Sequence, residues 1–322
     1  MGADEAKDST ASMALCQGPD FLPCFCLDRL FSLPWSDSPA RIASYPTTIS
    51  GNGMSTPLLE LEDLHFSYGS REVLRGINMI IAEGKITAIL GTSGCGKTTL
   101  LKLVGGQLRP DRGAVRFRGR VVHEMNDRQL YEMRREMGMM FQQGGLFSDM
   151  TVFDNVAFPI REHTRLPERL VRDLVLMKLQ AVGLRGARDL FPAELSGGMN
   201  RRVCLARAIA MDPTVTIYDE PFAGLDPISL NAVAKLIREL NDAIGITSIV
   251  VTYDVSESLK VVDEIFLLSE GIVVSHGDPT TLSDSDDAYA HQFIHAEPDG
   301  PVPFQVPAPS LASDFRFLRV ER

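Results

Sequence analysis

A glycine-rich stretch has the composition and spacing needed to bind phosphate groups. It reads Gly91-Thr-Ser-Gly-Cys-Gly-Lys97-Thr98, and its glycines allow successive backbone N–H groups to turn towards one anion. Lys97 would contact the β- and γ-phosphates of a nucleoside triphosphate, and the Thr98 hydroxyl would ligate Mg²⁺. The structural alternative is an ordinary turn between a strand and a helix. The residues predicted to bind the nucleotide here are Gly91, Thr92, Ser93, Gly94, Cys95, Gly96, Lys97, Thr98 and Thr99.

Two adjacent carboxylates, Asp219 and Glu220, end an apolar run that is typical of a buried strand. Asp219 suits the coordination shell of Mg²⁺, and Glu220 could orient and deprotonate the water that attacks a γ-phosphate. An acidic strand end by itself is common and is usually a solvated loop or a helix cap. Its pairing with the glycine-rich phosphate loop favours the functional interpretation.

The elements that would position these residues alternate between strand and helix patterns. The glycine-rich loop lies between a predicted buried strand and a predicted helix, as phosphate binding requires. Ser196 and Asp226 are predicted N-caps. The predicted strands cover 85–91, 114–123, 215–220, 246–254 and a hairpin of 264–268 with 272–275. The predicted helices end at Leu103 after the loop, cover 168–184 and 196–211, and begin at Asp226. This alternation predicts an α/β fold with a mainly parallel sheet.

The composition argues against several classes of protein. Most of the net charge of −10 lies in residues 1–53 and 278–322, so the near-neutral middle offers no basic surface for nucleic acid. No apolar run approaches the roughly 18–20 residues that cross a bilayer. The N-terminus carries Asp4 and Glu5 and does not have the pattern of a signal peptide. The cysteines form no set with metal-ligand spacing, which favours a reducing cytosol.

The two ends of the chain differ from the middle. Residues 1–53 show no sustained periodicity and are predicted to be a disordered extension, with Met54 as an alternative true start. Residues 278–322 are acidic and then rich in proline, and are predicted to form an extended tail. The prolines of residues 298–309 favour an extended path along a partner surface, such as that of a second protomer. A disordered acidic tail is the alternative.

The ordered set of motifs resembles the ABC ATPase family over nearly all of residues 58–277. Leu195-Ser-Gly-Gly-Met199 resembles the signature of that family, although alone it would indicate only a capped helix start. The resemblance implies a P-loop NTPase domain over residues 54–277, with an antiparallel β subdomain and a helical subdomain at about 144–200. It also implies hydrolysis of ATP by a head-to-tail homodimer, with Ser196, Gly197 and Gly198 facing the nucleotide bound by the other protomer.

Four further positions match the family one by one. Tyr68 resembles the aromatic residue that stacks on adenine. Gln142 corresponds to the glutamine that touches Mg²⁺ and couples to the membrane subunit, although its neighbour Gln143 stays an alternative. Asp226 belongs to a loop that resembles the link between the two ATP sites. Tyr253 stands where the family usually has a histidine, and a phenol cannot become a cation near neutral pH. The implied catalytic residues are Lys97, Gln142, Glu220 and Tyr253, and the implied metal ligands are Thr98, Gln142 and Asp219.

Longer segments narrow the resemblance to the ATPases of Mla phospholipid transport systems, which maintain outer-membrane lipid asymmetry in Gram-negative bacteria. These segments are 141–156, 158–163, 177–184 and 299–304. The resemblance implies phospholipid as cargo, an integral permease, a periplasmic lipid-binding subunit and a small cytoplasmic accessory protein. It places the chain at the cytoplasmic face of the inner membrane. The alternatives are the ATPase of an importer for another small solute and a soluble ABC ATPase outside transport.

Overall fold

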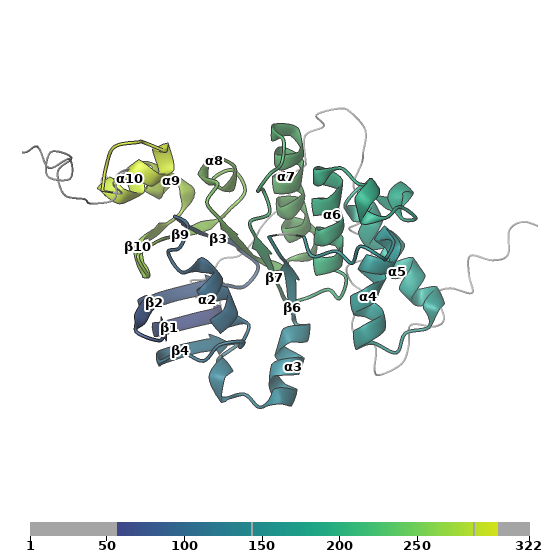
Figure 1. The fold of residues 1–322 in the computed structure, drawn as a ribbon, viewed down its shortest axis with the longest axis horizontal. Helices are drawn as coiled ribbons and strands as arrows, with labels where there is room; N and C mark the ends of the chain where they lie inside the picture. Colours follow the sequence, from purple (N-terminus) through teal and green to yellow (C-terminus); the bar gives the residue numbers. More distant parts are fainter. Residues whose placement is uncertain (1–56, 143, 286, 302–322) are drawn as a thin grey trace, which may run out of the picture. The chain divides into compact units, whose positions relative to one another are not determined.

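The computed structural model describes residues 57–142, 144–285 and 287–301 (Figure 1). The predicted extension of residues 1–53 and the alternative start at Met54 lie outside this part of the chain. The strands are β1 (Pro57–Tyr68), β2 (Arg71–Ala82), β3 (Ile86–Gly91), β4 (Arg112–Phe117), β5 (Arg120–Val121), β6 (Met137–Met140), β7 (Val215–Asp219), β8 (Thr247–Thr252), β9 (Glu264–Ser269) and β10 (Ile272–Gly277).

The helices lie between and after these strands (Figure 1). They are α2 (Lys97–Val104), α3 (Asp127–Arg135), α4 (Val152–His163), α5 (Glu168–Ala181), α6 (Gly197–Ala208), α7 (Pro227–Ile244), α8 (Val255–Ser258), α9 (Pro279–Ser283) and α10 (Ala288–His295), with short 3-10 helices η1 (Val122–Glu124), η2 (Arg185–Ala187) and η3 (Pro192–Glu194). None of the helices in the described ranges is both long enough and apolar enough to cross a membrane.

The larger sheet has six strands in the order β10-β9-β3-β8-β7-β6 and is parallel except at one edge. Side chains along β3 alternate between two hydrophobic clusters, with Ala88 and Leu90 in one and Ile89 in the other. Both faces of the sheet are therefore buried, which explains why its strands are nearly continuous apolar runs. The predicted α/β fold with a mainly parallel sheet is confirmed, and so is the hairpin formed by β9 and β10.

The smaller sheet, in the order β2-β1-β4-β5, is antiparallel and shares a hydrophobic cluster with α2. Leu64 of β1 and Leu100 of α2 belong to that cluster. This sheet is the antiparallel β subdomain that the family resemblance implies. The single strand predicted for 114–123 is in fact divided, because Arg118 and Gly119 both have positive φ and turn the chain between β4 and β5.

Helices α4, α5 and α6 pack against one another and form the helical subdomain that the resemblance implies. Asn155 of α4 is fully buried, and its amide nitrogen donates to the carbonyl oxygens of Phe147 and Met150, each at 3.1 Å. The same side chain accepts the Phe147 N–H at 2.8 Å. One satisfied amide thus holds the loop between β6 and α4 against its helix. The helix predicted over 168–184 ends at Ala181.

Two short helices, α9 and α10, follow β10, so the prediction of an extended tail is wrong for residues 279–283 and 288–295. The Asp278 carboxylate accepts two backbone N–H groups at the start of α9 and caps that helix. Leu282 of α9 and Ala290 of α10 are buried in the larger hydrophobic cluster. Two short amphipathic helices can therefore gain their stability from the core rather than from their own length. The proline-rich residues 302–322 lie outside the described part of the chain.

Candidate functional site

The glycine-rich loop connects the end of β3 to the start of α2, as predicted. Gly91 has a φ of 157° and Gly96 a φ of 112°. A Cβ atom on Gly91 would lie 2.4 Å from the Leu268 carbonyl oxygen, and one on Gly96 would lie 2.7 Å from a methyl carbon of Leu74. Both the backbone conformation and the close approach require glycine at these two positions. The shape of the loop is therefore set by its neighbours in the two sheets.

Lys97 lies across this loop. Its Nζ donates to the carbonyl oxygen of Gly91 at 2.6 Å and to that of Thr92 at 3.1 Å. The exposed members of the loop are Ser93, Gly94 and Thr98. The buried members are Gly91, Cys95, Gly96 and Thr99. The buried side chains pack into the core, so a ligand would meet the backbone, the Lys97 ammonium and the exposed members.

Glu220 follows directly after β7 and is 6% exposed. Its Oε2 accepts hydrogen bonds from the Thr252 hydroxyl at 2.9 Å and from the Tyr253 N–H at 3.4 Å. Its φ of 49° lies in the left-handed region, which costs a residue other than glycine about 1–3 kcal/mol. The neighbouring strand β8 thus holds the carboxylate through two donors while the backbone stays strained. Thr252 was not predicted as a site residue, although a threonine that ends a buried strand beside Tyr253 could have indicated it.

The carboxylates of Asp219 and Glu220 share an electrostatic environment with the loop. Burial raises the pKa of both groups. Other groups counteract this rise. The Thr252 hydroxyl lowers the pKa of Glu220, and the Lys97 ammonium lowers the pKa of both carboxyl groups. The cation of the loop therefore acts on both acids, so the structure brings together the two motifs that the sequence pairs.

Tyr253 lies beside the glycine-rich loop, and both predicted tyrosines present exposed rings. Tyr68 is 49% exposed, and its ring meets Phe66 edge-on with the centroids 4.9 Å apart. Tyr253 is 55% exposed. It lines a pocket of about 650 Å³ together with Thr92 of the glycine-rich loop, and residues of α10 form another wall. Helix α10 therefore borders the candidate site, which the sequence did not suggest.

The third motif starts helix α6. Ser196 is its N-cap, and its hydroxyl accepts the Met199 N–H at 3.3 Å. Gly198 is buried against Ser229, where a Cβ atom would lie 2.5 Å from the Ser229 hydroxyl oxygen. Asp226 caps α7 by accepting two N–H groups of its first turn, each at 3.0 Å. Both predicted N-caps are confirmed, and the two helix starts lie against each other.

Comparison with known proteins agrees with these motifs. Residues 74–223 match the ABC transporter family. The intermembrane phospholipid transport system ATP-binding protein MlaF of Haemophilus influenzae is 52% identical over 255 residues, which are 79% of this chain and 97% of that protein. The chain belongs to the ABC transporter family.

Solved structures of ABC cassettes share the fold of this ABC protein. The cassette cbiO1 from Clostridium perfringens, part of the ABC transporter complex cbiONQ, superposes with a TM-score of 0.67 at 34% identity over 70% of this chain and 90% of that chain. The cassette MJ0796, a dimer bound to ADP and Pi, superposes with a TM-score of 0.63 at 29% identity over 69% of this chain and 98% of that one.

Gln142 of this ABC protein follows β6 by two residues and lies close to the edge of the sheet at which β7 ends in Asp219. β6 pairs in parallel with β7, and Met140 stands opposite Tyr218, the residue before Asp219. Gln142 is exposed, and its backbone carbonyl accepts the Arg201 guanidinium at 2.5 Å. Its neighbour, the alternative Gln143, lies outside the described ranges, so Gln142 stays the predicted Mg²⁺ ligand with Gln143 as the alternative.

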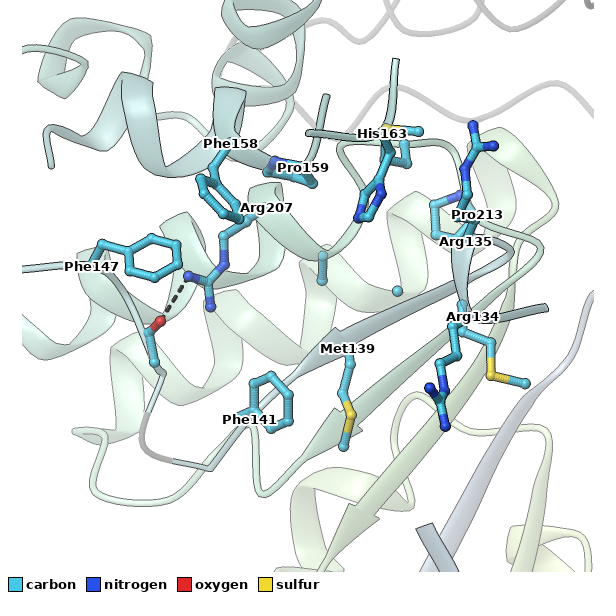
Figure 2. Close-up of a pocket in the computed structure, with 15 residues that line it drawn as sticks. Arg134, Arg135, Met139, Phe141, Phe147, Phe158, Pro159, His163, Arg207 and Pro213 are labelled. Carbon is cyan, nitrogen blue, oxygen red and sulfur yellow. Dashed lines mark hydrogen bonds between the residues drawn. The ribbon is translucent and has the colours of Figure 1, made fainter. Parts of the chain in front are cut away.

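An aromatic groove of about 300 Å³ borders the loop that carries Gln142 (Figure 2). Three of its phenylalanines are substantially exposed: Phe141 (47%), Phe147 (38%) and Phe158 (37%). The rings of Phe147 and Phe158 lie in contact, tilted by 54° with centroids 4.8 Å apart (Figure 2). The Arg207 guanidinium lies 5.8 Å from the centre of the Phe147 ring and donates to the Gly145 carbonyl at 2.7 Å. The groove therefore joins apolar surface to a fixed positive charge.

Proposed function

We propose that this chain is the ATP-hydrolysing subunit of an ABC transporter complex that moves phospholipid between the inner and outer membranes. The observation that carries the proposal is similarity along almost the whole length of an MlaF protein, which is named for ATP binding in intermembrane phospholipid transport. The geometry of the phosphate loop and of Glu220 supports the hydrolytic part of the proposal.

ATP and Mg²⁺ fit the candidate site. In the proposed complex, Lys97 and the loop N–H groups bind the phosphates, and the exposed ring of Tyr68 stacks on adenine. The exposed Thr98 hydroxyl, the Asp219 carboxylate and the Gln142 side chain are the kinds of oxygen donor that Mg²⁺ prefers. Held there, Mg²⁺ would neutralise negative charge on the phosphates.

Glu220 is the proposed general base. Its Oε2 is occupied by the Thr252 hydroxyl and the Tyr253 N–H, which leaves Oε1 to accept the proton of the attacking water. Burial raises the pKa of Glu220, so its carboxylate is a stronger base than that of an exposed glutamate. The Tyr253 phenol would donate a hydrogen bond to the γ-phosphate in place of the usual imidazolium.

Two copies of the chain would form the working motor, head to tail. Ser196, Gly197 and Gly198 start a helix whose N–H groups suit an anion, and in the proposed dimer they close over the γ-phosphate bound by the partner. Asp226 would link the two ATP sites. Ile228, which follows Asp226 after one residue, is 83% exposed, a degree of exposure that a contact with a second copy would reduce.

The aromatic groove is the proposed docking surface for the integral permease. Its phenylalanines offer apolar area to an inserted helix, and Arg207 at its border can meet the carbonyl groups that end a helix. Because Phe141 precedes Gln142, a permease bound in the groove would contact the segment that reaches the proposed Mg²⁺ site.

The remaining assignments follow the Mla resemblance. They are a periplasmic lipid-binding subunit, a small cytoplasmic accessory protein and a position at the cytoplasmic face of the inner membrane of a Gram-negative bacterium. The proposed ATPase domain covers residues 54–277, with α9 and α10 packed onto it. The proline-rich tail beyond α10 is proposed to contact the second protomer, and truncation after residue 301 that left dimerisation and transport unchanged would refute this.

Affinity purification tests the transport assignment. The tagged full chain is purified in mild detergent from its native membranes, and co-purifying proteins and lipids are identified together by mass spectrometry. We expect a multi-pass permease, a lipid-binding subunit and bound phospholipid. A permease with a receptor for another solute would refute the lipid assignment and keep the motor. Soluble partners alone, with the chain missing from the membrane fraction, would refute the transport function.

A further inference from the structure

The Arg201 guanidinium joins two loops that are far apart in the sequence. Arg201 lies in α6, little more than one turn after Ser196. Its Nη1 donates to the Gln142 carbonyl oxygen at 2.5 Å and reaches that of Phe141 at 3.4 Å, and its Nη2 donates to the Ala223 carbonyl oxygen at 3.1 Å. One side chain of α6 therefore holds both the loop of Gln142 and the loop that leads to Asp226.

The charge of Arg201 is directed at backbone oxygens. Within the described ranges no carboxylate forms an ion pair with this side chain, although many other arginines of the chain have such a partner. A hydrogen bond from a charged donor is roughly twice as strong as one between neutral groups. The planar fork of a guanidinium donates from separate nitrogens at a fixed spacing, so it can reach two loops at once, whereas a lysine donates from one nitrogen only.

Two neighbouring arginines of α6 provide an internal comparison. Arg202 donates to the Val182 carbonyl at 3.3 Å, at the C-terminal end of α5. Arg207 donates to the carbonyl oxygens of Gly144 and Gly145 and holds the later part of the Gln142 loop. Of these three side chains, Arg201 alone has a hydrogen bond to the loop before Asp226.

We infer that Arg201 is a positioning residue that keeps the Gln142 loop, the Asp226 loop and the N-terminus of α6 in a fixed relation during ATP hydrolysis. This inference rests on the proposed function, because it takes Gln142 as the ligand of Mg²⁺ and Asp226 as part of the link between sites. The hydrogen bonds of Arg201 go to the backbone of these two segments. Its effect on hydrolysis passes through the two backbone segments.

Hydrogen exchange of the full chain in its detergent-purified complex tests the contact itself. The variants are Arg201→Lys and the matched control Arg202→Lys, which changes the adjacent residue of the same helix. The Gly144 N–H donates to the Phe141 carbonyl at 2.8 Å, and the Leu225 N–H donates to that of Phe222 at 3.3 Å. We expect faster exchange of both amides in Arg201→Lys and of neither in Arg202→Lys. Unchanged exchange at both would overturn the inference.

Kinetics of the same complexes test the consequence for hydrolysis. We expect Arg201→Lys to raise the Mg²⁺ concentration for half-maximal ATPase activity by about tenfold, with no change in Arg202→Lys. In a Gln142→Ala background the substitution of Arg201 should not raise the Mg²⁺ requirement further, because the positioned side chain is gone. If Arg201→Lys has a lower melting temperature but the wild-type KM and Mg²⁺ requirement, its role is merely structural and the inference is overturned.

The two proposals fail in different ways. If Gln142→Ala leaves the Mg²⁺ requirement unchanged, the proposed Mg²⁺ ligand is wrong. The positioning role of Arg201 is then decided by hydrogen exchange and by the kcat of Arg201→Lys. If Gln142→Ala raises the requirement and Arg201→Lys does not, the site assignment stands and the positioning role is overturned.

Discussion

Two regions differ in burial and backbone strain: the sheet edge at which β3 and β7 end, and the aromatic groove. At the sheet edge, Gly91 leaves no room for a Cβ atom and Glu220 is buried with a strained backbone. In the groove, Phe147 and Phe158 keep more than a third of their surface exposed. The first region is held by backbone geometry that a substitution would disturb. The second presents side chains whose loss leaves the backbone in place.

This difference suggests how the two regions divide the work. A site for chemistry must keep its groups fixed before the substrate arrives, so it spends folding energy on burial and strain. A docking surface must stay accessible until a partner covers it, so its apolar side chains remain exposed in the isolated chain. Substitutions at the sheet edge should therefore change turnover, and substitutions in the groove should change association.

Glu220→Gln should have the largest effect. We expect kcat to fall by about a thousandfold, because an amide cannot accept the proton of the attacking water, while ATP still binds. Burial raises the pKa of Glu220 in the folded chain, so its contribution to stability is largest in acid and is lost as the pH rises through that value. The neutral variant should therefore melt at the same or a higher temperature at pH 7.

The matched control is Glu239→Gln, which changes an exposed glutamate of α7. Steady-state ATPase assays, nucleotide binding and thermal melts are compared for the two variants. Turnover in Glu220→Gln equal to that of the control would contradict both the assignment of the base and the contrast between the two regions.

Combined replacement of Phe147 and Phe158 by alanine should weaken association with the permease by at least about tenfold, since exposed aromatic anchors dominate such interfaces. ATP hydrolysis by the isolated chain should be unchanged. Ile80→Ala serves as the control, because Ile80 is 59% exposed on the antiparallel sheet. Co-purification and titration of the solubilised permease provide the measurement. Equal loss of affinity in the control variant would refute the assignment of the groove.

Tyr253→His should retain turnover or raise it severalfold. The side chain at this position is 55% exposed, so an imidazole can be accommodated, and an imidazolium near the γ-phosphate is a stronger donor than a phenol. Tyr253→Phe, which lacks the hydroxyl, is the companion variant. ATPase rates of the three proteins decide the point. A collapse of activity in Tyr253→His would reveal a specific role of the phenol.

Asp154→Asn should have the smallest effect, a loss of about 0.5–1 kcal/mol in the free energy of unfolding at pH 7, as is usual for a partly exposed ion pair. Hydrogen bonds from Arg161 and then Thr151 lower the pKa of Asp154. Its contribution is therefore present above the ordinary aspartate pKa and is lost as the pH falls through the lowered value.

Urea melts at several pH values should show wild type and Asp154→Asn converging in acid. Asp173→Asn, on the exposed side of α5, is the control. A difference between wild type and Asp154→Asn that is independent of pH would contradict the role of the ion pair. In that case the helical subdomain would owe its stability here to packing alone.

Features that depend on neighbouring residues could be predicted from the sequence. Each such feature spans only a few consecutive residues, so spacing alone indicates its geometry. Examples are the loop from Gly91 to Thr98, the acidic end of β7 and the caps at Ser196 and Asp226. Buried strands likewise reveal themselves by unbroken apolar runs. The family, the α/β fold and the pairing of the two motifs therefore follow from the chain read in order.

Other features needed the tertiary structure, because they join residues that are distant in the chain. The Thr252 hydroxyl reaches Glu220 only because β8 lies beside β7, and Arg201 reaches Ala223 only because α6 packs near that loop. Helices as short as α9 have too few residues to show a clear period, and their burial depends on the core that receives them. Spacing along the chain sets local geometry, whereas contacts across it exist only once folding has brought the two sides together.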